Sequence, residues 1–264
     1  MHFGMPTLME LNSLAANAAL CRALGLRFVE LNMCLPEYQA EQLDPRILRE
    51  IAEAHGIFYT IHLDDTNTPC DFNDRIAEAY LETVLQAIEA AKELAIPVLN
   101  MHLSLGTHMT LPDRKVLLFE RYGDIYYRKL LAFRGACERA IGGAAMKICV
   151  ENTRAFQHPL GARSLGLLLE SPVFGVTFDI GHDAANGFLQ RQLIDAHGAR
   201  LAHMHLHDTL PEERLDHLPL GEGTLRLESY LALAKARDCR AVLEVKTAAG
   251  LRKSVAWLKE RAWL

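Results

Sequence analysis

Short apolar runs rich in β-branched and aromatic residues alternate along the chain with longer segments in which apolar residues recur at helical spacing. The short runs predict eight strands, at residues 2–5, 28–32, 57–62, 98–102, 147–151, 176–179, 201–206 and 241–245. Strands that alternate with helices form parallel sheets, and eight such units in 264 residues predict an α/β fold, a single (β/α)8 TIM barrel spanning residues 1–264. An open doubly wound sheet is the alternative, although GMPTLMEL, which includes the end of the first strand, lacks the glycine-rich turn usual there.

Several helix ends can be placed from the sequence. Asp44 is a good N-cap, and Pro45 suits the first helical position. Glycines that end or follow helices favour left-handed backbone there, and these are Gly25, Gly56, Gly143 and Gly198. The stretch 103–145 is long for one helical unit, so we expect residues 106–112 to form a partial lid over the barrel mouth before a helix resumes near Val116. His108 and His158 are expected at the surface.

Polar residues fall at the ends of the predicted strands. Active sites of barrels lie at the carboxyl ends of the strands, which converge on one mouth. Six consecutive predicted strands carry a histidine or an acid there: His62, His102, Glu151, Asp179, His205 and Glu244. A lone histidine in such a place is usually structural, but charged groups gathered in one mouth are costly unless they are paired or coordinated. The pattern therefore predicts a site for a divalent cation.

The stretch HMHLHD, residues 203–208, places three histidines on alternate positions of one strand. Alternate side chains share a face, so these histidines are expected inside the barrel while Met204 and Leu206 pack outward. His205 has the right depth to meet Glu151, Asp179 and Glu244. His203 is expected one layer lower, as a core histidine bonded to a neighbouring strand. His207 and Asp208 could support the metal ligands or contact substrate.

Composition and net charge limit the kinds of binding partner and the location that we expect for the chain. The formal charge of −5 disfavours nucleic acid and anionic membranes as partners. No apolar run approaches the ~20 residues of a membrane span, and MHFGMPTLME does not resemble a secretory signal, so a cytoplasmic protein is expected. The 6 cysteines form no CxxC pair and are expected to be reduced.

Several short motifs together resemble the xylose isomerase-like barrel superfamily, which includes sugar and sugar-phosphate isomerases and epimerases and the deoxyribonuclease IV type of apurinic endonuclease. The motifs are ENT at 151–153, DIGH at 179–182, HLHD at 205–208, HLPLGEGT at 217–224 and LEVK at 243–246. The resemblance implies metal ligands at Glu151, Asp179, His205 and Glu244, which hold one divalent ion, manganese, magnesium or zinc, in the isomerase branch. Glu151 and Glu244 would also be the catalytic acid and base there.

The endonuclease branch implies more ions. Glu151 would bridge two zinc ions, with His62 and His102 on one of them, and a third zinc would use His182, His217 and an aspartate two residues before His217. Leu215 occupies that position here, and the nearest aspartate is Asp216, so the third site departs from the pattern.

Three functions fit this ligand set. The favoured one is a metal-dependent isomerase or epimerase of a sugar or sugar phosphate that acts through an enediolate. The alternatives are a multi-zinc apurinic endonuclease and a metal-binding barrel without catalysis. Asp64, Asp65, Asp71 and Asp74 follow the third strand and would repel a phosphate backbone.

Candidate substrate contacts are Glu30, Arg154, His207, Asp208 and Lys246, although Arg154 could equally be a solvated loop residue. The sequence specifies neither the substrate nor the metal, and a homo-oligomer is conceivable.

Overall fold

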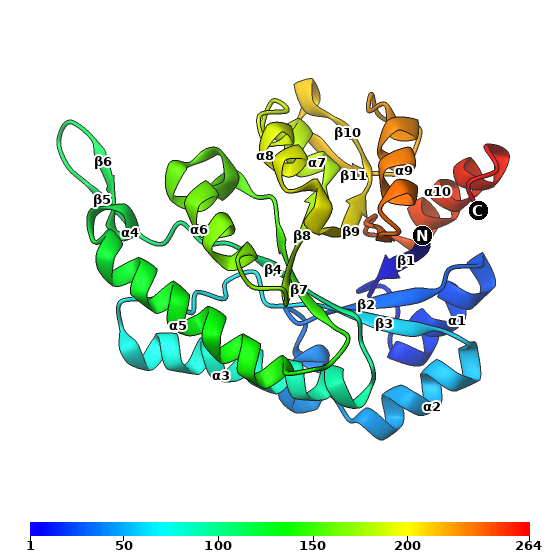
Figure 1. Cartoon of the computed structure of the whole chain (residues 1–264). Helices are drawn as coiled ribbons and strands as arrows, with labels where there is room; N and C mark the ends of the chain where they lie inside the picture. Colours follow the sequence, from blue (N-terminus) through cyan, green and yellow to red (C-terminus); the bar gives the residue numbers. More distant parts are fainter.

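Eight parallel strands close into a barrel in the computed structural model, which describes all residues from 1 to 264 (Figure 1). The strands are β1 (His2–Pro6), β2 (Phe28–Asn32), β3 (Phe58–His62), β4 (Val98–His102), β7 (Lys147–Glu151), β8 (Phe174–Asp179), β9 (Leu201–Leu206) and β12 (Arg240–Leu243). Around the barrel they follow the order β1-β12-β9-β8-β7-β4-β3-β2. The predicted (β/α)8 barrel is confirmed, and the open doubly wound sheet is wrong.

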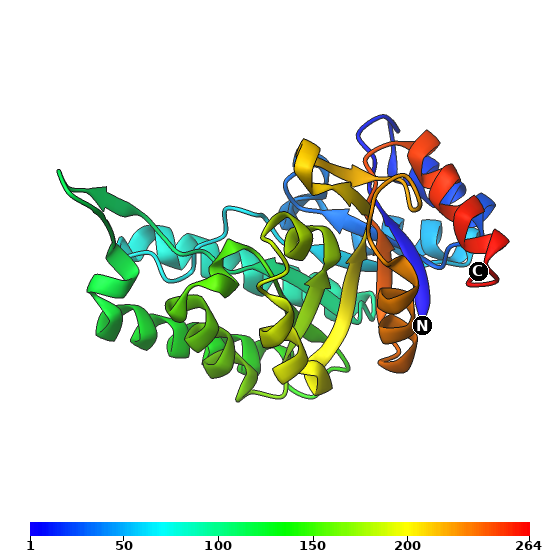
Figure 2. The same ribbon diagram turned by 90° about the horizontal axis from the view of Figure 1, so that it is seen from above.

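Helices cover the outside of the barrel (Figure 1 and Figure 2). The longer ones are α1 (Leu14–Leu24), α2 (Pro45–His55), α3 (Asp74–Glu93), α5 (Gly123–Ile141), α6 (Pro159–Leu169), α9 (Leu227–Ala236) and α10 (Ala248–Glu260). Short helices are α4 (Leu118–Arg121), α7 (Ile180–Ala185) and α8 (Arg191–Ala196), and 3-10 turns are η1 (Pro36–Tyr38), η2 (Ala40–Gln42), η3 (Arg154–Gln157), η4 (Gly198–Arg200) and η5 (Pro211–Glu213). None of these helices has both the length and the apolar composition that crossing a bilayer requires.

The barrel interior is apolar at one end and polar nearer the other. At the amino-terminal end, the rings of Phe28 and Phe58 stack with their centroids 5.1 Å apart. A Cβ on Gly4 would lie 2.5 Å from the Phe28 ring, so only glycine leaves room for it. Further along, His203 and His205 are fully buried and alternate with residues of the apolar core. The aromatic layer therefore closes the floor beneath a polar site.

Helix ends follow the expected chemistry at three of the predicted positions. Asp44 caps α2 by accepting a hydrogen bond from the backbone N–H of Arg46 at 2.9 Å, and Pro45 is the first helical residue. Gly25 and Gly56 follow α1 and α2 in the left-handed conformation, with φ of 82° and 62°.

The prediction is wrong for the other two glycines. The residue that follows α5 with a positive φ, 55°, is Gly142, because in a pair of adjacent glycines the first one directly succeeds the helix. Gly143 has no left-handed backbone, and Gly198 begins η4 instead of ending a helix.

A β-hairpin replaces most of the predicted lid. Strands β5 (His108–Thr110) and β6 (Lys115–Leu117) pair antiparallel and extend away from the barrel (Figure 2). Val116 pairs with Met109 in this hairpin, and the next helix, α4, begins two residues later. The expectation of a loop over the mouth is therefore wrong, whereas a helix does resume near Val116, at Leu118. His108 is exposed as expected, whereas His158 is partly buried and caps α6 through Nδ1, 3.2 Å from the Leu160 nitrogen.

Candidate metal centre

The structure brings the four expected metal ligands together at the carboxyl ends of neighbouring strands. Glu151 and Asp179 end β7 and β8, His205 lies in β9, and Glu244 directly follows β12. The Nδ1 atom of His205 is 2.9 Å from a Glu244 oxygen, 3.4 Å from a Glu151 oxygen and 3.7 Å from an Asp179 oxygen. One ring nitrogen therefore faces three carboxylates.

The short segments after β7 and β8 fix two of these carboxylates. Asp179 is the N-cap of α7, and its Oδ1 accepts a hydrogen bond from the His182 backbone at 2.6 Å. The side chain of Asn152 is bonded to both the N–H and the carbonyl of Asp179, at 2.6 and 2.8 Å, and to Gln190 at 2.7 Å. Asn152 was not singled out from the sequence, where it is only the middle residue of ENT. It is fully buried and ties the end of β7 to the end of β8.

Two observations show that these residues fit a divalent cation. The buried His102 Nε2 and both ring nitrogens of His205 lack a hydrogen-bond partner of good geometry, and His102 Nε2 and His205 Nδ1 face carboxylate oxygens of the cluster within 3.4 Å. The donor set mixes one imidazole with three carboxylates, which suits manganese, magnesium or zinc. A cation held by these residues would also compensate their negative charges, which are costly to bury unpaired.

The electrostatics keep the carboxylates ionised. Burial raises the pKa of Glu151, but the positive charges of His205 and His102 outweigh it and hold that pKa well below its usual range. Burial likewise raises the pKa of Glu244, and His205 and Lys246 bring it well below its usual range. Burial lowers the pKa of His205, whereas the charges of the surrounding glutamates raise it well above its usual value.

A second group of donors shares Glu151. The Nε2 atoms of His62 and His102 lie 3.4 and 3.3 Å from the same Glu151 oxygen. Their Nδ1 atoms lie 3.7 and 3.3 Å from an oxygen of Asp65, whose side chain is half-exposed. Asn100 also donates a hydrogen bond to that Glu151 oxygen. Asp65 was expected only to repel phosphates, because the sequence does not show that its loop folds back over β3 and β4.

The third group implied by the resemblance is rearranged. His182 lies against the main cluster, with Nδ1 3.1 Å from Glu151 Oε1. The nitrogen Nε2 of His217 is 3.6 Å from Glu244 Oε1. Asp216 instead faces His207, with 3.0 Å between Oδ1 and Nδ1. The shift of the aspartate by one residue therefore brings it closest to His207, and its other oxygen lies 3.7 Å from His217 Nδ1.

His207 supports Asp179 from behind. Its Nε2 atom is 3.2 and 3.3 Å from the two Asp179 oxygens, and its ring stacks on that of His217 at 4.4 Å. It is fully buried, and a Cβ on Gly181 would lie 1.8 Å from its Cε1. Burial lowers the pKa of His207, but the two facing aspartates, Asp179 and Asp216, raise it to about 10. Of the two roles expected for His207, these contacts favour support of a metal ligand over a substrate contact, because the ring is enclosed against Asp179.

Asp208 is also buried and has a structural role. Its carboxylate accepts hydrogen bonds from the backbone N–H groups of Thr209, Gly221 and Leu225 at 2.9, 3.0 and 3.1 Å. These bonds hold the loop that follows the small ribbon of β10 (Asp208–Leu210) and β11 (Leu215–Leu218). These bonds favour a role for Asp208 in holding this loop over the expected substrate contact.

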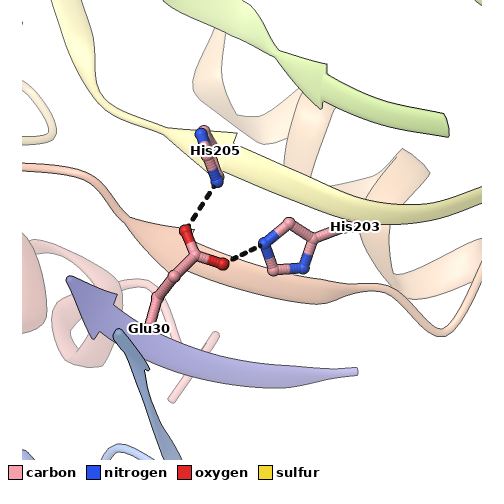
Figure 3. A group of neighbouring side chains, drawn as sticks. All are labelled: Glu30, His203 and His205. Carbon is pink, nitrogen blue, oxygen red and sulfur yellow. Dashed lines mark hydrogen bonds and ion pairs between the residues drawn. The ribbon is translucent and has the colours of Figure 1, made fainter. Parts of the chain in front are cut away.

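Glu30 and His203 lie beneath the centre, inside the barrel (Figure 3). Glu30 is 2% exposed and contacts His203 and His205, so its surroundings favour a role inside the barrel over the expected substrate contact. His203 lies one layer below His205 as expected, but its Nε2 contacts Glu30 of β2, 2.8 Å away across the barrel, and not a neighbouring strand. Burial raises the pKa of Glu30, yet His203 and His205 hold it well below its usual range. Burial lowers the pKa of His203.

The two basic candidates lie at the rim. Lys246 is exposed, and its Nζ is 2.7 Å from Glu244 Oε1. Arg154 begins η3, is exposed, and lines a hollow of about 460 Å³ that also includes His102, His182 and Asn186. This hollow adjoins the cluster, so Arg154 can contact a molecule that lies in it.

Comparisons with known proteins agree with this architecture. The family model described as xylose isomerase-like TIM barrel matches residues 18–261. An uncharacterized protein of Methanocaldococcus jannaschii is 25% identical over 212 residues, which cover 76% of this chain and 68% of that protein.

Solved structures share the fold. A D-tagatose 3-epimerase-like protein superposes with a TM-score of 0.79 at 23% identity, over 99% of this chain and 97% of the other. A 3-keto-D-glucoside 4-epimerase of E. coli has a TM-score of 0.77 at 15% identity, over 98% and 99% of the two chains. A D-psicose 3-epimerase has a TM-score of 0.74 at 12% identity and covers all of both chains.

Proposed function

The chain belongs to the xylose isomerase-like TIM barrel family, and from that premise we propose that it is a divalent-metal-dependent epimerase or isomerase of a sugar or sugar phosphate. The observation that carries the proposal is the convergence of Glu151, Asp179 and Glu244 on one nitrogen of His205. The names of the structural neighbours, which are sugar epimerases, support a carbohydrate substrate.

The proposed chemistry needs one metal and two carboxylates. A divalent ion held by Glu151, Asp179, His205 and Glu244 would act as a Lewis acid toward the carbonyl and neighbouring hydroxyl of the substrate. Glu151 and Glu244 contact the same imidazole from different strands and are ionised, so either can take the proton from the carbon next to the carbonyl. The same carboxylate or the other one returns it to the opposite face or to the neighbouring carbon.

The rim residues would bind and orient the substrate. The hollow beside His102 and His182 gives a sugar access to the cluster. Arg154 is exposed at this hollow and can donate to a hydroxyl or a phosphate. Lys246 holds Glu244 through the 2.7 Å contact and would keep that carboxylate oriented while it exchanges a proton.

A proton-exchange experiment tests this function. The manganese-loaded protein would be incubated with D-tagatose, D-psicose and D-fructose in D2O, and deuterium incorporation followed by NMR. We expect incorporation next to the carbonyl of at least one ketose, and its loss in Glu244→Gln and Glu151→Gln. Glu222→Gln is a matched control, because that exposed glutamate contacts only Lys253 on the surface. Unchanged exchange in Glu244→Gln would remove Glu244 from the mechanism, and tight metal binding without turnover on any sugar would favour a non-catalytic barrel.

One observation favours a second candidate, a zinc-dependent phosphodiesterase of the apurinic endonuclease type. His62 and His102 both approach Glu151, an arrangement that could hold a second ion. Asp65 and the net charge of −5 oppose a nucleic-acid backbone. Metal analysis separates the two: one ion per chain and no nicking of abasic DNA at physiological salt agree with the epimerase, whereas two or three zinc ions with robust nicking would reverse the ranking.

A further inference from the structure

A buried carboxylate lies on the opposite side of His205 from the candidate metal position. Glu30 projects from β2 into the barrel, and its Oε1 atom is 2.9 Å from the Nε2 of His205 (Figure 3). The other nitrogen of the same ring, Nδ1, faces Glu151, Asp179 and Glu244. His205 therefore lies between one carboxylate below and three above.

The contacts on the two sides of the ring determine which nitrogen keeps a proton when a cation is bound. A carboxylate oxygen only accepts, so without an ion both Nε2, 2.9 Å from Glu30, and Nδ1, 2.9 Å from Glu244, face acceptors. A cation among Glu151, Asp179 and Glu244 would take the place of the proton on Nδ1, whereas Nε2, which faces Glu30 on the other side, keeps its proton. Nδ1 is then the nitrogen that can coordinate an ion, and it is the one directed at the other ligands. Histidines that bind metals commonly donate their second N–H to a carboxylate, which sets both the tautomer and the ring orientation.

Glu30 is itself held in place. Its second oxygen, Oε2, accepts hydrogen bonds from His203 Nε2 and from Thr60 Oγ1, each at 2.8 Å. With a side chain only 3% exposed, it has little freedom to move. This arrangement also gives a role to His203, a fully buried histidine that the proposed chemistry does not use.

We infer that Glu30 is a positioning residue that holds His205 with Nε2 protonated and Nδ1 presented to the divalent ion, and that His203 and Thr60 anchor Glu30 for this purpose. The inference rests on the metal site of the proposed function. It assigns Glu30 to the interior of the barrel, beneath the metal, and removes it from the substrate surface.

The test compares metal affinities of purified variants. The side-chain amide in Glu30→Gln has only one oxygen, so it cannot accept hydrogen bonds from both His203 and His205 as the two carboxylate oxygens can. The dissociation constants for Mn2+ and Zn2+, measured by chelator competition, should therefore rise by roughly 10- to 100-fold at unchanged stoichiometry. The imidazole N–H resonance of His205 in the zinc-loaded protein should shift or exchange faster in 15N-filtered NMR spectra. Thr60→Val removes one anchor and should weaken binding by only a few-fold, which provides a second measurement if Glu30→Gln does not fold.

A control separates affinity from stability. Asn17 is a fully buried residue of α1 whose side chain bonds Leu8 and Ser13, so Asn17→Ala should lower the melting temperature without changing the metal dissociation constants. The inference would be overturned if Glu30→Gln bound metal with wild-type affinity. Should that variant fail to fold, wild-type affinity in Thr60→Val would overturn it. Loss of one of two bound ions in Glu30→Gln would also overturn it, because Glu30 would then be a ligand. Absence of metal binding in the wild type would instead refute the proposed function.

Discussion

Single residues at this site act in pairs that cross between strands. His205 and His207 lie two positions apart, yet the first faces three carboxylates and the second supports one of them, Asp179, from behind. The position of His207 behind Asp179 depends on a small neighbouring residue. Gly181 lies directly against the ring of His207, so the position of that ring is sensitive to one methyl group.

We predict that Gly181→Ala displaces His207 and destabilises the protein. The added Cβ would lie 1.8 Å from the ring, and overpacking of this kind costs roughly 1–3 kcal/mol. Chemical denaturation of the metal-free protein measures the change. Gly166→Ala is the matched control, because a Cβ there meets nothing within 4 Å, and an interior helix position should gain about 0.5–1 kcal/mol. Equal stability of the two variants would show that His207 can move at no cost.

The sequence predicted which residues gather at the mouth better than it predicted their depth. Glu151, Asp179 and His205 could be placed because strand ends converge in any barrel. Glu30 was expected to contact substrate at the mouth but lies one layer lower, since depth depends on strand stagger and side-chain reach, which a sequence pattern does not contain. The role of Asn152 depends on a contact with the next strand, and nothing in its own neighbourhood indicates it.

At the level of elements, the prediction was good where burial determines structure and poor where it does not. All eight barrel strands were placed, six of them to within one residue at both ends, because each is a run of buried residues. The segment that forms β5 and β6 has exposed side chains on its first strand, so no alternation marked it. Its structure is instead set by local turn bonds, such as that from the Leu111 N–H to the Arg114 carbonyl at 2.8 Å.

We predict that this hairpin can be shortened with little effect. The Leu118 N–H bonds the Thr107 carbonyl at 3.0 Å, so replacement of residues 109–116 by two glycines keeps the base closed. The free energy of unfolding should change by less than about 1 kcal/mol, because little apolar surface is lost. Phe119→Ala, at a buried ring stacked on Tyr126, is the contrasting variant and should cost about 3–5 kcal/mol. A comparable loss in the shortened chain would indicate that the hairpin packs against another surface, such as a second copy.

At the level of the whole molecule, the metal-free barrel holds histidines and carboxylates of opposite charge close together in its mouth. Burial lowers the pKa values of His62 and His182, but Glu151 and Asp179 among other carboxylates raise them to about 9 and about 10. The carboxylates are shifted in the other direction, with the pKa of Glu151 well below its usual range. Stability and protonation are therefore linked across the site, and a bound cation would replace the protons.

We predict that the metal-free protein is most stable between about pH 5 and pH 6.5. A histidine with a raised pKa stabilises the fold fully below its unfolded value, and this contribution disappears as the pH rises through about 9 for His62 and about 10 for His182 and His207. A carboxylate with a lowered pKa, such as Glu151, acts in the opposite sense, and its contribution is lost as the pH falls below its unfolded value. Melting temperatures of the chelator-treated protein from pH 4 to 10 should therefore pass through a maximum.

Saturating manganese should flatten the alkaline side of this curve, because the ion takes the place of protons that would otherwise be lost. Calorimetry in two buffers should detect the release of these protons when manganese binds at pH 7. An alkaline decline of the same steepness with and without the metal would mean that the ion does not bind among these histidines.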